Sequence, residues 1–291
     1  MHKSGFVSIL GKPNVGKSTL MNAFLGENLS ITNPKAQTTR HRILGIMNAE
    51  EYQIVFSDTP GIIKPGYKLQ EFMMSFVHSS LEDADAFIIV TEVGEDLLET
   101  NIIENIKKSD IPTILVINKI DLSDQKTVEQ KIKTYNERFP DWEVVPASAI
   151  NAFNIEKIFN FILDHTPEAP PYFSKDEISD KPVRFFVAEI IREKILSLYK
   201  KEIPYSVEVE VESYKEEKKI VNIRCIIYVE RETQKGILIG HKGNMLKKVG
   251  TFARQDIEKF IDKRVFLELH VKVNKNWREN ENQLKRFGYK M

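Results

Sequence analysis

The stretch FVSILGKPNVGKST, residues 6–19, places a glycine-rich loop between a strand pattern and a helix pattern. Phe6–Leu10 is an apolar run rich in β-forming residues, and Leu20–Leu25 has apolar side chains at helical spacing. The loop has the spacing G-x-x-x-x-G-K-S, in which glycines let backbone N–H groups turn toward phosphates and the following helix favours an anion at its N-terminus. The stretch therefore predicts a nucleotide-phosphate site rather than a turn with a surface lysine.

Each loop residue is a candidate nucleotide contact. Lys17 is expected to reach the β- and γ-phosphates, and the Ser18 hydroxyl is expected to hold Mg²⁺. The candidates from this loop are Gly11, Lys12, Pro13, Asn14, Val15, Gly16, Lys17, Ser18 and Thr19.

Composition describes an ordinary globular protein of one large or two medium domains. The chain has 291 residues, of which 42% are hydrophobic and 29% are charged. One cysteine, Cys225, excludes an intramolecular disulfide framework and fits a reducing compartment. The apolar runs fall short of the roughly 18 residues that span a bilayer. The first strand pattern starts within five residues, which leaves no room for a targeting peptide, so we expect a cytoplasmic location.

Charge is distributed unevenly along the chain. Residues 1–165 carry 16 Lys and Arg against 22 Asp and Glu, and residues 166–291 carry 26 against 20. From Thr233 onward the ratio is 14 to 6, a net charge of +8. A basic C-terminal part favours a polyanionic partner there.

A second phosphate motif follows the strand pattern Tyr52–Phe56. It reads Asp58-Thr59-Pro60-Gly61 and lies about 40 residues beyond the loop. A carboxylate at the carboxyl end of a strand is placed where an α/β sheet presents ligands. We expect Asp58 to bind Mg²⁺, through water, and the Gly61 N–H to meet the γ-phosphate.

The base would be recognised by Asn118-Lys119-Ile120-Asp121, directly after the strand pattern Thr113–Ile117. Asp121 can accept N1–H and N2–H of guanine together, a donor pair that adenine lacks. Asn118 would brace the loop, and the stem of Lys119 would lie along the ring. After the next strand pattern, a backbone N–H at Ser148-Ala149 is expected to meet the guanine O6.

Strand and helix patterns alternate over the first 165 residues. This order predicts an α/β domain, a mostly parallel sheet with helices on both faces, with all motifs at the carboxyl ends of strands. Residues 166–182 contain four prolines and no periodicity, which indicates a linker. Residues 183–291 then form a second, α+β domain that ends in a basic amphipathic segment.

The second domain carries a G-x-x-G sequence between two helix patterns. Its residues are Gly240-His241-Lys242-Gly243, followed by Lys247 and Lys248. In KH domains such a loop clamps the backbone of four single-stranded nucleotides. The predicted order helix–strand–strand–helix–loop–helix–strand matches the type II KH arrangement, so we expect RNA binding at these six residues.

Taken together, the motifs resemble the Era family of bacterial ribosome-assembly GTPases over essentially the whole chain. The matching sequences are GKPNVGKS (11–18), TTR (38–40), DTPG (58–61), NKID (118–121) and SA (148–149), followed by the KH pattern. The resemblance implies a GTP-hydrolysing, largely monomeric switch that binds the 3′ end of 16S rRNA and assists 30S subunit maturation. It also implies peripheral association with the inner membrane, which only the basic C-terminal segment supports.

The resemblance assigns roles to further residues. Thr39 would coordinate Mg²⁺ in the GTP state, with Thr38 as the adjacent rival, so that Lys17, Thr39 and Gly61 form the catalytic set. Asn14 resembles an asparagine that holds K⁺ in related potassium-activated GTPases. Arg40 and Arg42 are alternatives for stabilising the transition state.

One position departs from Ras-like GTPases. The residue after Gly61 is Ile62, not the glutamine that orients the attacking water, and Ile63 follows. We therefore expect slow intrinsic hydrolysis. Two other functions stay open. One is a GTPase of the same class acting on membranes or in tRNA modification, with the C-terminal domain as a protein-interaction module. The other is an RNA-binding module with an inactive nucleotide site. The second is disfavoured because Lys17, Ser18, Asp58 and Asp121 are all present.

Overall fold

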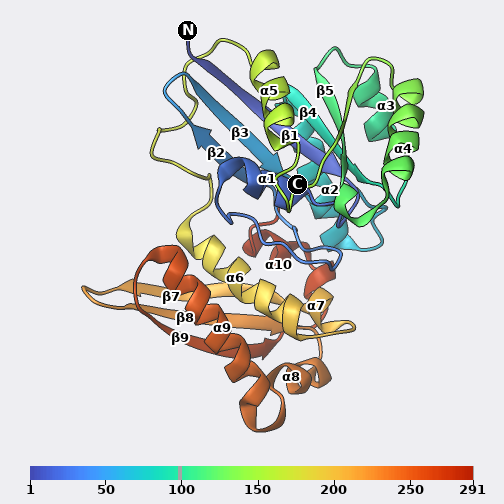
Figure 1. Cartoon of the computed structure of the whole chain (residues 1–291). Coiled ribbons are helices and arrows are strands. Elements are labelled where there is room, and N and C mark those ends of the chain that lie inside the picture. Colours follow the sequence, from blue (N-terminus) through green and yellow to red (C-terminus); the bar gives the residue numbers. More distant parts are fainter. Residues whose placement is uncertain (98–99, 291) are drawn as a thin grey trace. The chain divides into compact units, whose positions relative to one another are not determined.

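The computed structural model describes residues 1–97 and 100–290 (Figure 1). The chain divides into two units. Unit 1 comprises Met1–Lys64 and Met73–Asp180, and unit 2 comprises Pro65–Phe72 and Lys181–Met291.

Unit 1 is built around a six-stranded sheet in the order β2-β3-β1-β4-β5-β6. All neighbouring pairs are parallel except β2 and β3, which are antiparallel. The strands are β1 (Lys3–Gly11), β2 (Ile43–Asn48), β3 (Tyr52–Asp58), β4 (Ala86–Glu92), β5 (Thr113–Asn118) and β6 (Glu143–Pro146). The helices are α1 (Lys17–Leu25), α2 (Lys68–Glu82, of which the residues from Met73 on belong to unit 1), α3 (Asn101–Lys107), the 3₁₀ turn η1 (Ile120–Leu122), α4 (Gln125–Arg138) and α5 (Ile155–His165). The predicted α/β domain with a mostly parallel sheet is confirmed.

Helices cover both faces of this sheet (Figure 1). One apolar cluster joins α2, α3 and α4 to β1, β4 and β5, and α1 packs with α5 on the other face. Strand β5 is buried at every position, which explains why it reads as a continuous apolar run instead of an alternating one.

Local signals set the helix ends. Asp124 caps α4 by accepting the Thr127 N–H at 3.0 Å, and Thr100 caps α3 by accepting from Ile103. The register then brings the predicted motifs to one edge of the sheet. Asp58 pairs with Ile9, and Asn118 pairs with Glu92, so that the carboxyl ends of β1, β3 and β5 lie together.

Residues 166–180, part of the predicted linker, are bonded to strands β1, β2 and β3 of unit 1. Ser4 donates its N–H to Pro167 O at 3.1 Å, and the Ile46 N–H donates to Ile178 O at 3.0 Å. Gln53 Oε1 accepts the N–H groups of Tyr172 and Phe173. The proline-rich composition rules out regular elements but leaves these backbone groups free to pair along β1 and β2.

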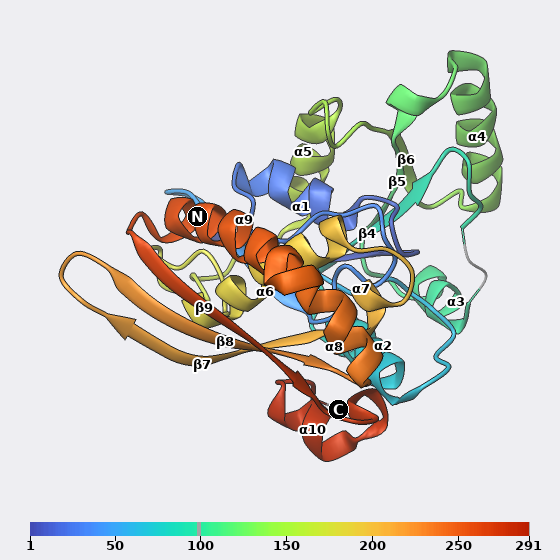
Figure 2. The same cartoon turned by 90° about the horizontal axis from the view of Figure 1, so that it is seen from below.

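Unit 2 is an α+β domain with a three-stranded sheet in the order β7-β8-β9. Strands β7 and β8 are antiparallel, whereas β8 and β9 are parallel. Helices α6, α8 and α9 lie on one face of this sheet (Figures 1 and 2). The elements are α6 (Val183–Leu198), α7 (Ile203–Ser206), β7 (Glu208–Glu216), β8 (Val221–Val229), α8 (Glu232–Ile239), η2 (His241–Gly243), α9 (Asn244–Ile261), β9 (Val265–Val273), η3 (Trp277–Glu279) and α10 (Glu281–Arg286). The predicted type II KH order is confirmed, and α7 is an addition to it.

The basic C-terminal segment is part of the core of unit 2. Trp277, Leu284 and Tyr289 are each 0% exposed. The indole N–H of Trp277 donates to Ser206 O at 3.2 Å, and the Tyr289 hydroxyl lies 2.9 Å from Glu208 Oε2. The apolar side of this segment is therefore occupied by the domain itself. Among the described residues, no helix is both long and apolar enough to cross a membrane.

Candidate functional site

A cavity of about 740 Å³ opens at the motif-bearing edge of the sheet in unit 1. The predicted site residues that line it are Pro13, Asn14, Gly16, Lys17, Ser18, Thr19, Thr39, Gly61, Lys119 and Ala149. Those that are not part of the lining are Gly11, Lys12, Val15, Asp58, Thr59, Pro60, Asn118, Asp121 and Ser148. Apart from Pro60, the residues of the second group contact the loops of the site as described below.

The phosphate loop has a backbone that ordinary residues adopt at a cost. Gly16 has φ 97°, and a Cβ on it would lie 2.1 Å from the side-chain amide nitrogen, Nδ2, of Asn118. Only glycine allows both that conformation and that approach. Asn14, which lines the cavity, also has a left-handed backbone, with φ 67°.

Lys17 points its ammonium group back over the loop. It is 6% exposed and donates to the carbonyl oxygens of Lys12 at 2.8 Å and Gly11 at 3.3 Å. Burial lowers the pKa of Lys17 to about 8, and the nearby Asp58 carboxylate acts in the opposite direction. Within the described residues, the hydrogen bonds of this ammonium group go to neutral carbonyls, so it is well placed to receive an anionic ligand.

Three oxygen-bearing side chains meet beside Lys17. Ser18 Oγ donates to Asp58 Oδ2 at 2.6 Å and lies 2.9 Å from Thr39 Oγ1, and Thr39 Oγ1 lies 3.4 Å from the same carboxylate oxygen. Within the described part of the chain, the buried Oδ1 of Asp58 has no hydrogen-bond partner. Two hydroxyls and a carboxylate are hard oxygen ligands of the kind that Mg²⁺ prefers, so these residues fit the predicted metal set.

The hydroxyl of Thr38, the alternative to Thr39, is bonded to backbone carbonyl groups of the preceding residues. It donates to Lys35 O at 2.6 Å and lies 3.3 Å from Asn33 O. The geometry favours Thr39 as the metal ligand.

The predicted guanine loop is braced at three points. Asn118 donates from Nδ2 to Val15 O at 2.9 Å and accepts the Ala149 N–H at 3.0 Å. The Ser148 hydroxyl donates to Asp121 Oδ1 at 2.5 Å. The loop places Lys119 in the left-handed region, with φ 59°, and its ammonium group pairs with Glu92.

The remaining motif residues have supporting roles. Thr59 is buried and donates its hydroxyl to Ile9 O at 2.8 Å. The Ile62 N–H donates to Gly11 O at 2.9 Å, which holds Gly61 against the phosphate loop. Lys12 forms an ion pair of 3.3 Å with Glu95.

Sequence reasoning missed one wall of the cavity. Residues between α1 and β2 that line it include Gly26, Glu27, Asn28, Ile31, Thr32, Asn33, Pro34 and Gln37. This stretch has no periodicity or motif spacing from which a ligand role could be read. Ile150 also lines the cavity and is 78% exposed.

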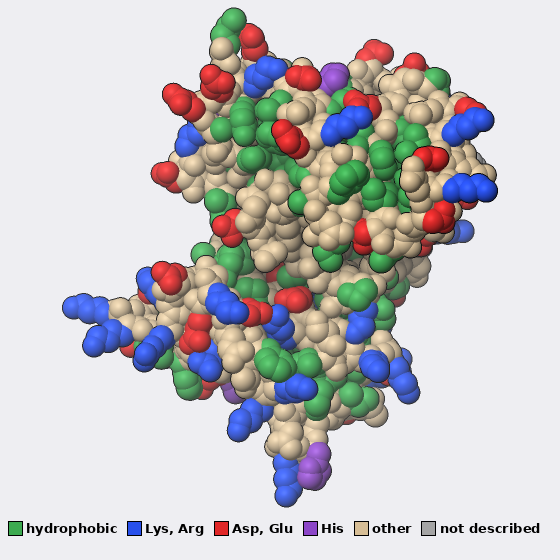
Figure 3. All heavy atoms as spheres, in the orientation of Figure 1, with side chains coloured by type: hydrophobic (Ala, Val, Ile, Leu, Met, Phe, Trp, Pro, Cys, Tyr) green, Lys and Arg blue, Asp and Glu red, His purple; other side chains and the backbone are tan. Residues whose placement is uncertain are grey.

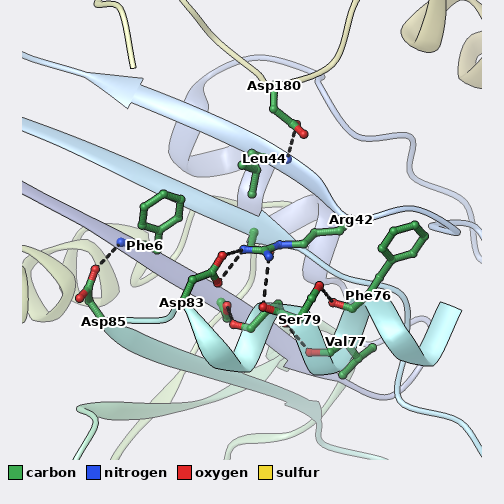
Figure 4. Close-up of polar contacts among 12 residues, drawn as sticks. Phe6, Arg42, Leu44, Phe76, Val77, Ser79, Asp83, Asp85 and Asp180 are labelled. Atoms are coloured by element: carbon green, nitrogen blue, oxygen red, sulfur yellow. Dashed lines mark hydrogen bonds and ion pairs between the residues drawn. The ribbon is translucent and has the colours of Figure 1, made fainter. Parts of the chain in front are cut away.

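Arg42, one of the two arginines considered for stabilising the transition state, is bonded away from the cavity in this structure. Its guanidinium is held by Ser57, Ser79 and Asp83, and Arg42 is not among the cavity-lining residues (Figure 4). Arg40 is only 1% exposed.

In unit 2, the G-x-x-G loop forms a tight turn between α8 and α9. Gly240 has φ 73° and ψ 177°, and a Cβ on it would lie 2.7 Å from the Met245 side chain. The side chains of His241, Lys242, Lys247 and Lys248 are exposed. Ile237, which sequence reasoning missed, is 51% exposed one turn before the loop. Figure 3 shows Lys and Arg side chains gathered over the visible face of unit 2.

Known proteins match both units and the whole chain. A family described as 50S ribosome-binding GTPase matches residues 6–119, and the KH domain family matches residues 202–278. The GTPase Era of Clostridium kluyveri is 46% identical over 293 aligned positions, which cover 100% of both chains. The GTPase Era of Thermoanaerobacter sp. (strain X514) is 49% identical, with 99% of this chain and 97% of the relative covered.

Two solved structures have the same fold throughout. One is Era in complex with MgGDPNP and nucleotides 1506–1542 of 16S ribosomal RNA, with a TM-score of 0.93, 39% identity and 100% of both chains covered. The other is a variant of Aquifex aeolicus Era bound to GDP and AlF4⁻, with a TM-score of 0.93, 40% identity, and 99% of this chain and 100% of that chain covered.

Proposed function

The chain belongs to the Era family of GTPases, and from that premise we propose that it is a GTP-driven switch that binds the 3′ end of 16S rRNA and assists maturation of the 30S subunit. The observation that carries the proposal is the meeting of Ser18, Thr39 and Asp58 beside a buried lysine, in a chain that also presents an exposed G-x-x-G loop.

GTP is hydrolysed to GDP and phosphate in the cavity of unit 1. Lys17 neutralises the β- and γ-phosphates, and the Gly61 N–H contacts the γ-phosphate. Ser18, Thr39 and Asp58 would hold Mg²⁺, which supplies positive charge to the oxygens of the transferred phosphoryl group. Thr39 would be held through Mg²⁺ and Gly61 by its contact with the γ-phosphate. Loss of the γ-phosphate therefore releases the segment before β2 and the segment after β3.

Guanine selection rests on Asp121. Its carboxylate accepts N1–H and N2–H of the base, and the Ser148 hydroxyl fixes one of its oxygens. Lys119 lies along the ring, and the Ala149 backbone closes the site near O6.

Hydrolysis is slow without a partner. The Ile62 side chain is 3% exposed and has no polar atom, so it cannot orient the attacking water. Asn14 would hold K⁺ beside the phosphates, and a rate that is equal in KCl and NaCl would exclude this role.

Unit 2 would clamp the phosphate backbone of single-stranded RNA at Gly240–Gly243, with Lys242, Lys247 and Lys248 supplying charge. We also propose that the protein is a monomer and is located in the cytoplasm. The buried apolar side of the C-terminal segment gives membrane association no support beyond the family likeness.

The experiment is binding of a labelled RNA fragment from the 16S rRNA 3′ end to the GTP-analogue form, with a scrambled fragment as control. Gly240→Asp should abolish binding, because it adds a side chain and a negative charge where the backbone must approach phosphate. Lys218→Gln, a matched loss of charge at the exposed β7–β8 turn, should leave binding within twofold. Equal binding of the scrambled RNA would overturn the rRNA assignment and leave the GTPase activity standing.

A further inference from the structure

Arg42 joins three elements of unit 1 through one guanidinium group (Figure 4). Nε donates to Ser57 Oγ at 2.7 Å, and Nη1 donates to Ser79 O at 3.2 Å. Nη2 donates to both oxygens of Asp83, at 2.8 and 2.7 Å. The contacts therefore link the residue just before β2 to the end of β3 and the end of α2.

The β3 contact lies directly behind the predicted metal site. Ser57 and Asp58 are consecutive in β3, so their side chains point to opposite faces of the sheet. Leu44 pairs with Ser57 and Ile43 pairs with Asp58, which puts Arg42 on the Ser57 face. Arg42 thus contacts β3 on the face of the sheet opposite to the Asp58 carboxylate.

The α2 contact completes a helix end. The last four carbonyl groups of a helix have no partner within it, and cations are favourable there. The last turn of α2, all of which is described, contains no basic residue. Arg42 supplies the cation at Ser79 O, and the Ser8 hydroxyl donates to Ser80 O at 2.5 Å.

The arrangement is more than a surface ion pair. The Arg42 side chain is 14% exposed, its Nη2 reaches both carboxylate oxygens of Asp83, and its other two bonds go to β3 and α2. A planar guanidinium makes all of these contacts from one position, which a lysine ammonium cannot do.

Thr39 lies three residues before Arg42. We propose that Arg42 is a positioning residue for GTP hydrolysis, which fixes the start of β2 so that the Thr39 hydroxyl stays beside Ser18 and Asp58. The inference rests on the metal role proposed for Thr39. Arg42 acts through that segment, because it is not among the residues that line the nucleotide cavity.

The test is the Mg²⁺ concentration that gives half-maximal binding of a fluorescent non-hydrolysable GTP analogue, and separately of fluorescent GDP. Thr39 contributes only when the γ-phosphate is bound, so Arg42→Gln should raise the Mg²⁺ requirement for the analogue about tenfold and for GDP less than twofold. Arg42→Lys should resemble Arg42→Gln because one ammonium group cannot reach Ser57, Ser79 and Asp83 together.

Three variants make the result decisive. Asp83→Asn, at a residue whose side chain is 43% exposed, should reproduce most of the shift and carries the test if Arg42→Gln does not fold. Lys157→Gln removes an exposed ion pair of 3.1 Å with Glu143 in the same unit and should change neither value. Thr39→Ala removes the proposed Mg²⁺ ligand itself, so it gives the largest increase in Mg²⁺ requirement that is expected for the analogue.

A shift confined to the analogue in the Arg42 and Asp83 variants supports the proposal. Equal shifts for analogue and GDP would show a general structural role and overturn it. A shift in Thr39→Ala without one in the Arg42 variants would also overturn it, while the metal role of Thr39 would stand. If Thr39→Ala itself has no effect, both fail together.

Discussion

Asn118 donates from its side-chain amide to the carbonyl oxygen of Val15 at 2.9 Å, which ties the guanine loop to the phosphate loop. Its Oδ1 accepts the Ala149 N–H at 3.0 Å, and the residue is 2% exposed. One buried side chain therefore sets the distance between the parts of the site that hold the base and the phosphates.

Asn118→Ala should weaken GDP binding about 30- to 150-fold, because two buried hydrogen bonds of roughly 1–1.5 kcal/mol each are lost. Fluorescence titration with a GDP derivative measures the change. A loss smaller than threefold would mean that the two loops hold their spacing without this residue.

Asp121→Asn should exchange guanine for xanthine. The carboxylate accepts two N–H groups of guanine, whereas an amide can donate to the C2 oxygen of xanthine. Competition of GDP and XDP for a labelled nucleotide measures the selectivity, with wild type preferring GDP and the variant preferring XDP. Retention of guanine preference in the variant would move base recognition away from Asp121.

Cys225 gives unit 2 a pH dependence. Burial raises the pKa of its thiol from 9.0 to about 12, and the residue is 0% exposed. Because the folded state keeps the proton longer than the unfolded state, the stabilisation is complete below pH 9 and is lost as the pH rises toward 12. From pH 9 to 10 the free energy of unfolding should fall by about 1 kcal/mol from this group.

Urea denaturation at both pH values, with Cys225→Val as the control, isolates this contribution. The difference between the two pH values should shrink in the variant. Rapid reaction of the native thiol with an alkylating reagent at pH 8 would contradict the burial.

Arg192 and Glu189 form a buried pair in the core of unit 2. Arg192 donates from Nε and Nη2 to the two Glu189 oxygens at 2.7 and 2.5 Å, and the two side chains are 1% and 8% exposed. Arg192→Met should cost about 3–5 kcal/mol because the carboxylate is left buried without its partner.

The double variant Glu189→Leu/Arg192→Met should recover part of that loss, since the Glu189 carboxylate is no longer buried without its partner. The buried Glu208 carboxylate, which also lies near Arg192, keeps its contact with the Tyr289 hydroxyl in both variants. Thermal or urea unfolding of the full chain checks both variants. A cost below about 1 kcal/mol for the single variant would show that water reaches the carboxylate.

The parts of this account that sequence could predict are those fixed by spacing along one element. Gly11–Ser18, Asp58–Gly61 and Asn118–Asp121 each follow a strand, and parallel strands bring their ends to one edge. The G-x-x-G loop is also predictable from spacing along the chain, because it lies between two helices with clear apolar periodicity.

The remainder depends on contacts between distant segments without a repeating pattern. The hydrogen bonds from Arg42 to Asp83 join residues that are 41 positions apart in the sequence. The bond between Ile46 and Ile178 uses backbone atoms that any residue has. The sequence predicts a basic amphipathic C-terminal segment but not the burial of Trp277 and Tyr289, because these two residues are few among charged neighbours. Periodicity alone does not show which surface covers them.

The most direct test of the central claim is RNA affinity measured in two nucleotide states at one fixed salt concentration. Protein loaded with GDP or with a non-hydrolysable GTP analogue is titrated against the single-stranded fragment from the 16S rRNA 3′ end. A GTP-gated switch predicts binding at least tenfold tighter with the analogue, and loss of that difference in Thr39→Ala. Equal affinity in the two states would contradict the coupling between nucleotide and RNA on which the proposed function rests.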